Sequence, residues 1–353
     1  MLVIFGGRSS EHEISCISAA GVLRALDRTR YDVRAVGILP EGRWVTAPTD
    51  PDLIAASSGA LPTVQDSGEH VVVLPEPLGS SGLAQAISDV DVVFPVLHGP
   101  WGEDGTIQGL LEMAGVPYVG SGVFASAASM DKGHMKAVLE QAGLPVGDYA
   151  MITPRDRQRG GDVRARIEHL ALPWFVKPAR AGSSVGITRV SDPQLFDDAF
   201  AEALRWDPRV IVEAGVTGAR EIECGVLAGD DGLPIASRCA EIRVRPGRDF
   251  YDYEAKYLDD AAELIVPAEL PDAVEAKVQE LAVQAFDALD CEGLARVDFF
   301  VTDDAIIVNE VNTMPGFTPI SMYPRMWEAS GVAYAELIDR LLADALRRGT
   351  GLR

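Results

Sequence analysis

The chain has 353 residues, 47% of them hydrophobic and 24% charged, which is typical of a globular protein large enough for two or three domains. Its 53 acidic and 31 basic side chains give a net charge of −22, which argues against a broad nucleic-acid-binding surface. The N-terminal residues show neither the basic region nor the cleavage site of a signal peptide, so secretion is not expected, and no apolar run approaches the roughly 20 residues of a membrane span. We therefore expect a cytoplasmic protein with neither nucleic-acid nor membrane partners. A reducing compartment also fits its scattered cysteines, Cys16, Cys224, Cys239 and Cys291.

Strand and helix signals alternate over residues 1–121. A buried strand at 2–6 precedes a helix over 13–26, and two further strands are expected at 33–39 and 91–97. Short buried strands alternating with helices predict a mostly parallel, Rossmann-like sheet. The glycine-punctuated stretch 115–122 is a plausible hinge, so a first domain is predicted to end at residue 121.

The first strand ends in a glycine turn of the kind that often cradles a phosphate. However, Glu11 and Glu13 occupy the turn that follows, where a phosphate would lie. Their charge has the wrong sign for phosphate and the right sign for an ammonium group. The sequence therefore favours an amino group as the ligand of this turn.

The remaining chain mixes α/β and α+β signals in two further units, predicted at 122–216 and 217–353. One helix is expected from Ser126 to Gly143, where a glycine and a following proline end the pattern. Strands are expected around a Gly-Ser loop and again at 209–213, with a helix between them. The last unit should hold several strands, a helix over 271–289 and a closing helix over 334–347.

The loop "GSSVG" (182–186) matches the nucleophile elbow of α/β-hydrolases, with Ser184 as its serine. That interpretation requires a helix after the serine and a histidine later in the chain. Instead, a β-branched run follows, and all five histidines precede the loop. The loop could equally be a structural hairpin or a flap over phosphates beside Lys177, whose backbone and hydroxyl donors would form a nest.

Two apolar strands near the C-terminus carry Asp298, Glu310 and Asn312. Carboxylates facing a core require neutralisation, and oxygen donors suit a hard cation such as Mg²⁺. Glu310 and Asn312 share one face of a strand. Asp298 joins them if the intervening turn has an odd number of residues, which would place Asp298 opposite Glu310. The alternative is an amphipathic hairpin with solvated acids.

Seven motifs now stand in order: "GGRSSEHEIS", "LHGPWGEDGTIQG", "SMDK", "KPARAGSSVG", "DYEAKY", "RVDFF" and "NEVNTMPG". Together they resemble the D-alanine–D-alanine ligases of the ATP-grasp superfamily, over residues 3 to about 324. The resemblance implies a Rossmann-like N-terminal domain followed by a two-part ATP-grasp module. It also implies an ATP-dependent ligation of two D-alanines through an acyl phosphate, for peptidoglycan precursor synthesis, and a homodimer.

By the same resemblance, ATP contacts are assigned to Lys132, Lys177, Ser184, Glu213, Glu221 and Asn309. Asp298, Glu310 and Asn312 are expected to hold Mg²⁺, with Mn²⁺ as an alternative. Among 31 basic residues only five are lysines (Lys132, Lys136, Lys177, Lys256 and Lys277), and four of them fall in or beside these motifs.

The substrate and catalytic residues are implied in the same way. Glu11 would bind the ammonium of the first D-alanine, with His98 nearby. Lys256 and Ser321 would bind the carboxylate of the second D-alanine. The oxyanion of the tetrahedral intermediate would be stabilised by Arg296 and the Gly316 amide. Ser183 and Tyr257 match a pair that hydrogen-bonds to Glu11.

Three functional hypotheses follow from these residues. The first is the D-alanine–D-alanine ligase, and the second is a D-alanine–D-lactate ligase or another ATP-grasp carboxylate–amine ligase. The third is a non-catalytic binding protein on the same scaffold. In D-lactate ligases a histidine is expected in the loop around residue 256, whereas this chain has no histidine after His169. An amine nucleophile is therefore favoured.

Overall fold

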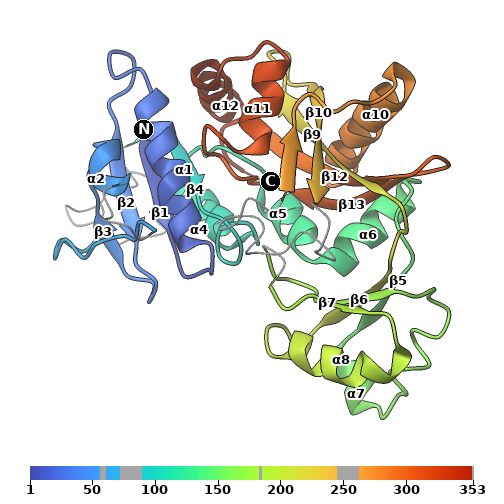
Figure 1. Cartoon of the computed structure of the whole chain (residues 1–353). Coiled ribbons are helices and arrows are strands. Elements are labelled where there is room, and N and C mark those ends of the chain that lie inside the picture. The colour runs from blue at the N-terminus through green and yellow to red at the C-terminus, as the bar shows by residue number, and fades with distance from the viewer. Residues whose placement is uncertain (56–60, 72–89, 183–184, 245–261, 352–353) are drawn as a thin grey trace.

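The computed structural model describes residues 1–55, 61–71, 90–182, 185–244 and 262–351, and their strands form three sheets (Figure 1). The N-terminal sheet has the order β3-β2-β1-β4, with β1 Leu2–Gly6, β2 Arg34–Ile38, β3 Trp44–Thr46 and β4 Val93–Val96. The small sheet has the order β5-β8-β6-β7, with β5 Tyr149–Ile152, β6 Trp174–Pro178, β7 Thr188–Val190 and β8 Val210–Ala214. The C-terminal sheet has the order β11-β10-β9-β12-β13, with β9 Arg220–Ala228, β10 Pro234–Val244, β11 Ala262–Ile265, β12 Leu294–Val301 and β13 Ile306–Asn312.

The helices cover these sheets. They are α1 His12–Ala25, α2 Pro51–Ala55, α4 Thr106–Ala114, α5 Val123–Met130, α6 Lys132–Gln141, α7 Pro154–Gln158, α8 Phe196–Leu204, α10 Asp272–Ala288, α11 Met322–Ala329 and α12 Tyr334–Arg348, with a 3-10 turn at Pro193–Leu195. Within the described residues, none of them is both long and apolar enough to cross a bilayer. Helices α2, α4, α7 and α11 were not predicted from the sequence.

The N-terminal sheet follows the predicted parallel pattern, because β1 pairs in parallel with both β2 and β4. Alternate residues of β1 point to opposite faces. Val3 and Phe5 pack in the same core cluster as α1, whereas Leu2 and Ile4 pack in the cluster that includes α4. Helices therefore bury both faces of the sheet, as parallel sheets require.

The single helix predicted from Ser126 to Gly143 is wrong, because the chain breaks at Asp131 into α5 and α6. Asp131 has an extended backbone, and its carboxylate accepts hydrogen bonds from the backbone N–H groups of Gly133 and His134, both at 3.1 Å. This is an N-cap, which satisfies donors that the helix itself cannot. The break places Lys132 at the first position of α6.

Helices α5 and α6 belong to the core of the C-terminal sheet, although the sequence analysis grouped them with the small sheet. Ala125, Met135 and Leu139 pack in one cluster with strands β9, β12 and β13 and helix α10. The small sheet has its own core under α8, with Trp174 and Phe196 in edge-to-face contact at 5.9 Å. The predicted domain boundaries remain predictions.

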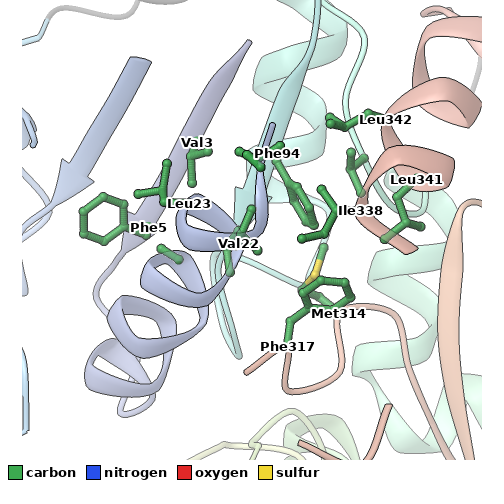
Figure 2. Close-up of a cluster of buried hydrophobic side chains, with 14 of the residues drawn as sticks. Val3, Phe5, Val22, Leu23, Phe94, Met314, Phe317, Ile338, Leu341 and Leu342 are labelled. Atoms are coloured by element: carbon green, nitrogen blue, oxygen red, sulfur yellow. The ribbon is translucent and has the colours of Figure 1, made fainter. Parts of the chain in front are cut away.

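The N- and C-terminal parts of the chain share a third core, shown in Figure 2. Ile338 and Leu341 of α12, with Phe317 from the loop after β13, pack against the α1 side of the N-terminal sheet. Phe317 is fully buried and lies 5.6 Å from the ring of Phe94 in β4. This packing fixes the loop after β13 against the first domain.

Candidate active site

One cavity of about 660 Å³ is lined by residues of the small and C-terminal sheets, by residues of α1, α5 and α6, and by the loops between these elements. Every predicted site residue that the structure describes lines this cavity: Glu11, His98, Lys132, Lys177, Glu213, Glu221, Arg296, Asp298, Asn309, Glu310, Asn312, Gly316 and Ser321. Four further predicted residues, Ser183, Ser184, Lys256 and Tyr257, lie outside the described residues. The cavity therefore brings together residues separated by up to 310 positions in the chain.

The buried carboxylate of Glu11 lies where the N-terminal domain approaches Gly182. Glu11 precedes α1 and makes no side-chain cap to that helix. A Cβ added at Gly99 or at Gly182 would lie 2.7 Å from its Oε2 atom, so these glycines allow both loops to approach the carboxylate. This arrangement fits an anion that binds a ligand rather than a helix cap.

His98 follows β4, and both of its ring nitrogens are engaged within the protein. Nδ1 lies 3.0 Å from the carbonyl oxygen of Met314, and Nε2 lies 3.1 Å from the Ser18 hydroxyl. Because a carbonyl only accepts, Nδ1 carries the proton and Nε2 accepts from Ser18. Burial lowers the pKa of His98, an effect partly offset by the charge of Glu11. We interpret His98 as a neutral residue that joins the first domain to the loop after β13.

Glu103 forms a second connection between the same two segments. Its carboxylate accepts hydrogen bonds from the backbone N–H groups of Gly99, at 2.6 Å, and Met314, at 3.1 Å. Burial and the nearby charge of Glu11 raise the pKa of Glu103 to about 8. The sequence showed this acid in "HGPWGEDG", but nothing in the local pattern indicated that it is half-buried between two segments.

Two predicted phosphate-binding lysines lie near the small sheet. Lys132 Nζ lies 3.4 Å from Glu310 Oε2 and donates to the Ala181 carbonyl at 3.3 Å. Lys177 projects from β6 and forms an ion pair with Glu213 of β8. Burial alone would lower the pKa of Lys177, but Glu213 and other nearby carboxylates raise it overall. Lys177 is therefore positively charged where it lines the cavity.

Glu213 also contacts a second lysine, Lys136 of α6, at 3.0 Å. The side chains of Glu213 and Lys136 are only 9% and 3% exposed. Burial would raise the pKa of Glu213, but the two ammonium groups outweigh that effect and hold it well below its usual range. Nothing in the sequence had pointed to a role for Lys136.

Asp298 lies opposite Glu310, the pairing that was expected only for a turn with an odd number of residues. Strand β12 ends at Val301 and β13 begins at Ile306, so four residues form the turn. An even turn would pair Asp298 with Asn309. The register shifts by one residue between Asp298 and Phe299, leaving Asn309 as the extra residue of a β-bulge. The bulge thereby restores the pairing with Glu310.

This bulge gathers oxygen donors with Arg296 on one face of the sheet. Arg296 donates two hydrogen bonds to the Asp298 carboxylate, both at 2.7 Å, and the Asn312 amide donates to Asp298 at 3.1 Å. Arg296 also lies 3.3 Å from Glu223, which pairs with Asp298 across β9 and β12. Burial would lower the pKa of Arg296, but these carboxylates raise it well above its usual value.

The loop after β13 contributes Gly316 and Ser321. The Ser321 hydroxyl oxygen accepts from the backbone N–H of Thr318 at 3.1 Å and lies 2.8 Å from the Thr318 hydroxyl. A Cβ added at Gly316 would lie 3.2 Å from the Ser321 hydroxyl oxygen, so the two residues are neighbours in the cavity wall. The arrangement offers a backbone donor and a hydroxyl on the side of the cavity nearest α11.

Two family models match the chain, one described as the D-ala D-ala ligase N-terminus over residues 1–121 and one as the C-terminus over 138–343. The chain belongs to the D-alanine–D-alanine ligase family. A D-alanine–D-alanine ligase from Frankia casuarinae is 56% identical over 100% of this chain and 98% of its own. Another from Rhodococcus opacus is 54% identical over 99% of this chain and 98% of its own.

Solved structures of D-alanine–D-alanine ligase relatives share the fold over nearly the whole chain. The VanG D-Ala:D-Ser ligase from Enterococcus faecalis matches with a TM-score of 0.82 and 36% identity, covering 98% of both chains. The D-alanine–D-alanine ligase from Coxiella burnetii matches with a TM-score of 0.80 and 37% identity, covering 98% of this chain and 93% of its own. The predicted fold class and the predicted membership of an enzyme family are therefore confirmed. The hydrolase interpretation is not supported, and a strand, β7, follows the Gly-Ser loop.

Proposed function

We propose that this D-alanine–D-alanine ligase family member joins two D-alanines to D-alanyl-D-alanine at the expense of ATP, for peptidoglycan precursor synthesis. The supporting observation is the shared cavity, in which Glu11 lies toward the first domain while Lys132, Lys177 and Arg296 lie toward the other two sheets. The cavity thus offers a carboxylate that can bind an ammonium group and cations that can bind phosphates. This arrangement of charges suits an amino acid substrate and a nucleotide bound side by side.

In the proposed reaction, a carboxylate oxygen of the first D-alanine attacks the γ-phosphorus of ATP, and ADP leaves. The deprotonated amine of the second D-alanine then attacks the acyl carbon. The C–O bond to phosphate breaks, giving the amide and inorganic phosphate. Glu11 would hold the ammonium of the first substrate, and Lys132 and Lys177 would hold the phosphates. Negative charge on the tetrahedral intermediate would be stabilised by Arg296 and the Gly316 N–H.

The remaining residues are proposed to place the nucleotide and the second substrate. Glu213 would contact adenine, Glu221 the ribose hydroxyls, and Asn309 the phosphates, together with the Ser184 hydroxyl. Ser321 and Lys256 would hold the carboxylate of the second D-alanine. The proposed roles of Ser183 and Tyr257 are to orient Glu11.

Dependence on ATP and a divalent metal ion follows from family membership. We propose Mg²⁺, with Mn²⁺ as a substitute, held by Asp298, Glu310 and Asn312. Their oxygen donors suit a hard cation, and the bulge at Asn309 brings them to one face. When bound, the ion neutralises charge on the phosphates. We expect EDTA to abolish phosphate release and excess Mg²⁺ to restore it; activity in EDTA would contradict the assignment.

The proposed reaction is tested by measuring phosphate release from Mg²⁺ and ATP with D-alanine, L-alanine, or D-alanine mixed with D-lactate or D-serine. We expect release with D-alanine and none with L-alanine. Mass spectrometry should show the D-alanyl-D-alanine dipeptide as the main product in the mixtures. No D-alanine-dependent phosphate release would sink the proposal, and a D-alanyl-D-lactate or D-alanyl-D-serine product would replace its second substrate.

We also propose that the protein acts in the cytoplasm as a homodimer. The four cysteines are free thiols buried in the fold, which suits a reducing compartment. Sedimentation at several protein concentrations tests the dimer, and a single monomeric species throughout would contradict it.

A further inference from the structure

Lys136 is a buried cation that the proposed reaction does not use. Its side chain is 3% exposed, and its Nζ lies 3.0 Å from Glu213 and 5.8 Å from the centre of the Tyr149 ring. It lies behind Glu213, in a small recess that Gly147 and Phe300 also line, rather than in the wall of the main cavity. Burying an ammonium group is costly, and its ion pair with Glu213 offsets that cost.

Glu213 thus joins two ammonium groups, one facing the cavity and one behind it. Lys136 and Lys177 contact different oxygens of the same carboxylate. The three side chains together carry one net positive charge. Without Lys136, Glu213 and Lys177 would form a neutral pair, and Lys177 would be the only ammonium group paired with that carboxylate.

The surroundings make this charge important, because the cavity wall is rich in acids. Glu221 and Glu310 act on Lys177 in addition to Glu213. Each uncompensated carboxylate repels an anionic nucleotide. Lys136 offsets one of these charges without occupying the cavity.

We propose that Lys136 is a positioning residue that shares the Glu213 carboxylate and so leaves the charge of Lys177 available to a nucleotide phosphate. This inference rests on the proposed ATP site. It predicts that Lys136 governs the affinity for the charged part of the nucleotide more strongly than the affinity for adenosine, although Glu213 itself is proposed to contact adenine.

The test compares the dissociation constants of ADP and adenosine, measured with Mg²⁺ and without D-alanine, in wild type, K136M and K136R. Methionine keeps the apolar stem and removes the charge. We expect K136M to bind ADP roughly tenfold more weakly, the effect of one unit charge about 10 Å away at an effective dielectric constant of about 20. Adenosine binding should change by less than about threefold, and K136R should regain most of the ADP affinity.

Lys277 provides the control, because it is half exposed on α10 and pairs only with Glu280 among the contacts described, at 2.9 Å. K277M should bind ADP like wild type. If K136M does not fold, K136Q takes its place with the same expectation. A folded K136M or K136Q with wild-type ADP affinity overturns the proposal, as does an equal loss of ADP and adenosine affinity, which would indicate general damage to the site.

The two proposals fail in distinguishable ways. A wild-type protein that binds ADP but releases no D-alanine-dependent phosphate would contradict the proposed function and leave the role of Lys136 standing. A wild-type protein with no ADP binding would overturn both.

Discussion

The carboxylate of Glu11 lies where the segment before α1, the turn at Gly99 and Gly182 come together. Replacing Glu11 by Gln removes its charge and keeps its shape. A charge-assisted hydrogen bond contributes about 2 kcal/mol, so we expect the KM for the first D-alanine to rise about 30-fold. Steady-state kinetics at saturating ATP measure this rise.

Glu13, in the first turn of α1, is the matched control, and E13Q should keep the wild-type KM. ADP affinity should stay unchanged in E11Q, because the proposed nucleotide contacts belong to other residues. Equal loss of ADP and D-alanine affinity in E11Q contradicts the assignment of Glu11.

Glu103 gives the protein a pH dependence of known sign. Its pKa in the folded state, about 8, lies above the ordinary value of 4.5 expected in the unfolded state. The stability that this group contributes is therefore fully present below about pH 4.5 and is lost as the pH rises through 8. Each pKa unit of difference between the two states corresponds to about 1.4 kcal/mol, so the contribution of Glu103 to the free energy of unfolding is at most a few kcal/mol.

We expect the free energy of unfolding of wild type to fall between pH 5 and pH 9. In E103Q, this fall should be smaller by a few kcal/mol, because the titrating carboxyl is absent. Denaturant titrations at both pH values measure the difference. E328Q, on the exposed side of α11, should keep the wild-type slope. If E103Q and wild type have the same slope, the carboxyl does not titrate in this range.

At the scale of elements, the β12–β13 hairpin shows what residue patterns can and cannot predict. The spacing of Glu310 and Asn312 correctly indicated one shared face, whereas Asp298 was expected on that face only if the turn had an odd number of residues. The turn length and the β-bulge that set this register were not predicted, because a turn of even length combined with a bulge gives the same pairing as an odd turn. Bulges depend on the partner strand, so a single strand's sequence does not reveal them.

The break at Asp131 is a second element that the sequence analysis missed, although an aspartate before the first helical residue is a recognised N-cap signal. Continuous helical periodicity on both sides concealed it. Asp131 caps α6 and also forms an ion pair with Arg209 at 3.0 Å. It thereby fixes the start of the helix that carries both Lys132 and Lys136.

We expect D131A to lose about 1–2 kcal/mol of stability from the cap and to bind ADP more weakly, because Lys132 loses its fixed position. D131N keeps an acceptor oxygen, so it should lose less stability and less ADP affinity than D131A. Thr153 caps α7, away from the cavity, so T153A should lose a similar cap and keep the wild-type ADP affinity. Calorimetry measures both quantities, and a destabilised D131A with normal ADP affinity argues against this positioning role.

At the scale of the whole molecule, the ordered motifs predicted the fold class and the set of residues that line the cavity. They could not indicate how distant segments meet. The bonds of His98 and Glu103 to Met314 join residues more than 200 positions apart. Such contacts depend on the packing of α12 and Phe317 against the first domain, and no local periodicity records that packing.

Phe317 connects this shared core to the active site, because it follows Gly316 directly and packs among Phe94, Tyr323 and Tyr334. We expect F317A to lose about 3–5 kcal/mol of stability and to raise the KM for D-alanine, since Gly316 and Met314 lose their support. Leu342 of α12 lies in the same core, away from the loop (Figure 2), so L342A should lose about 2–5 kcal/mol with little change in KM. Denaturant titration gives the stabilities, and kinetics at a temperature where both variants are folded give the KM values. If L342A raises KM as much as F317A does, the core supports the fold in general rather than positioning the loop after β13.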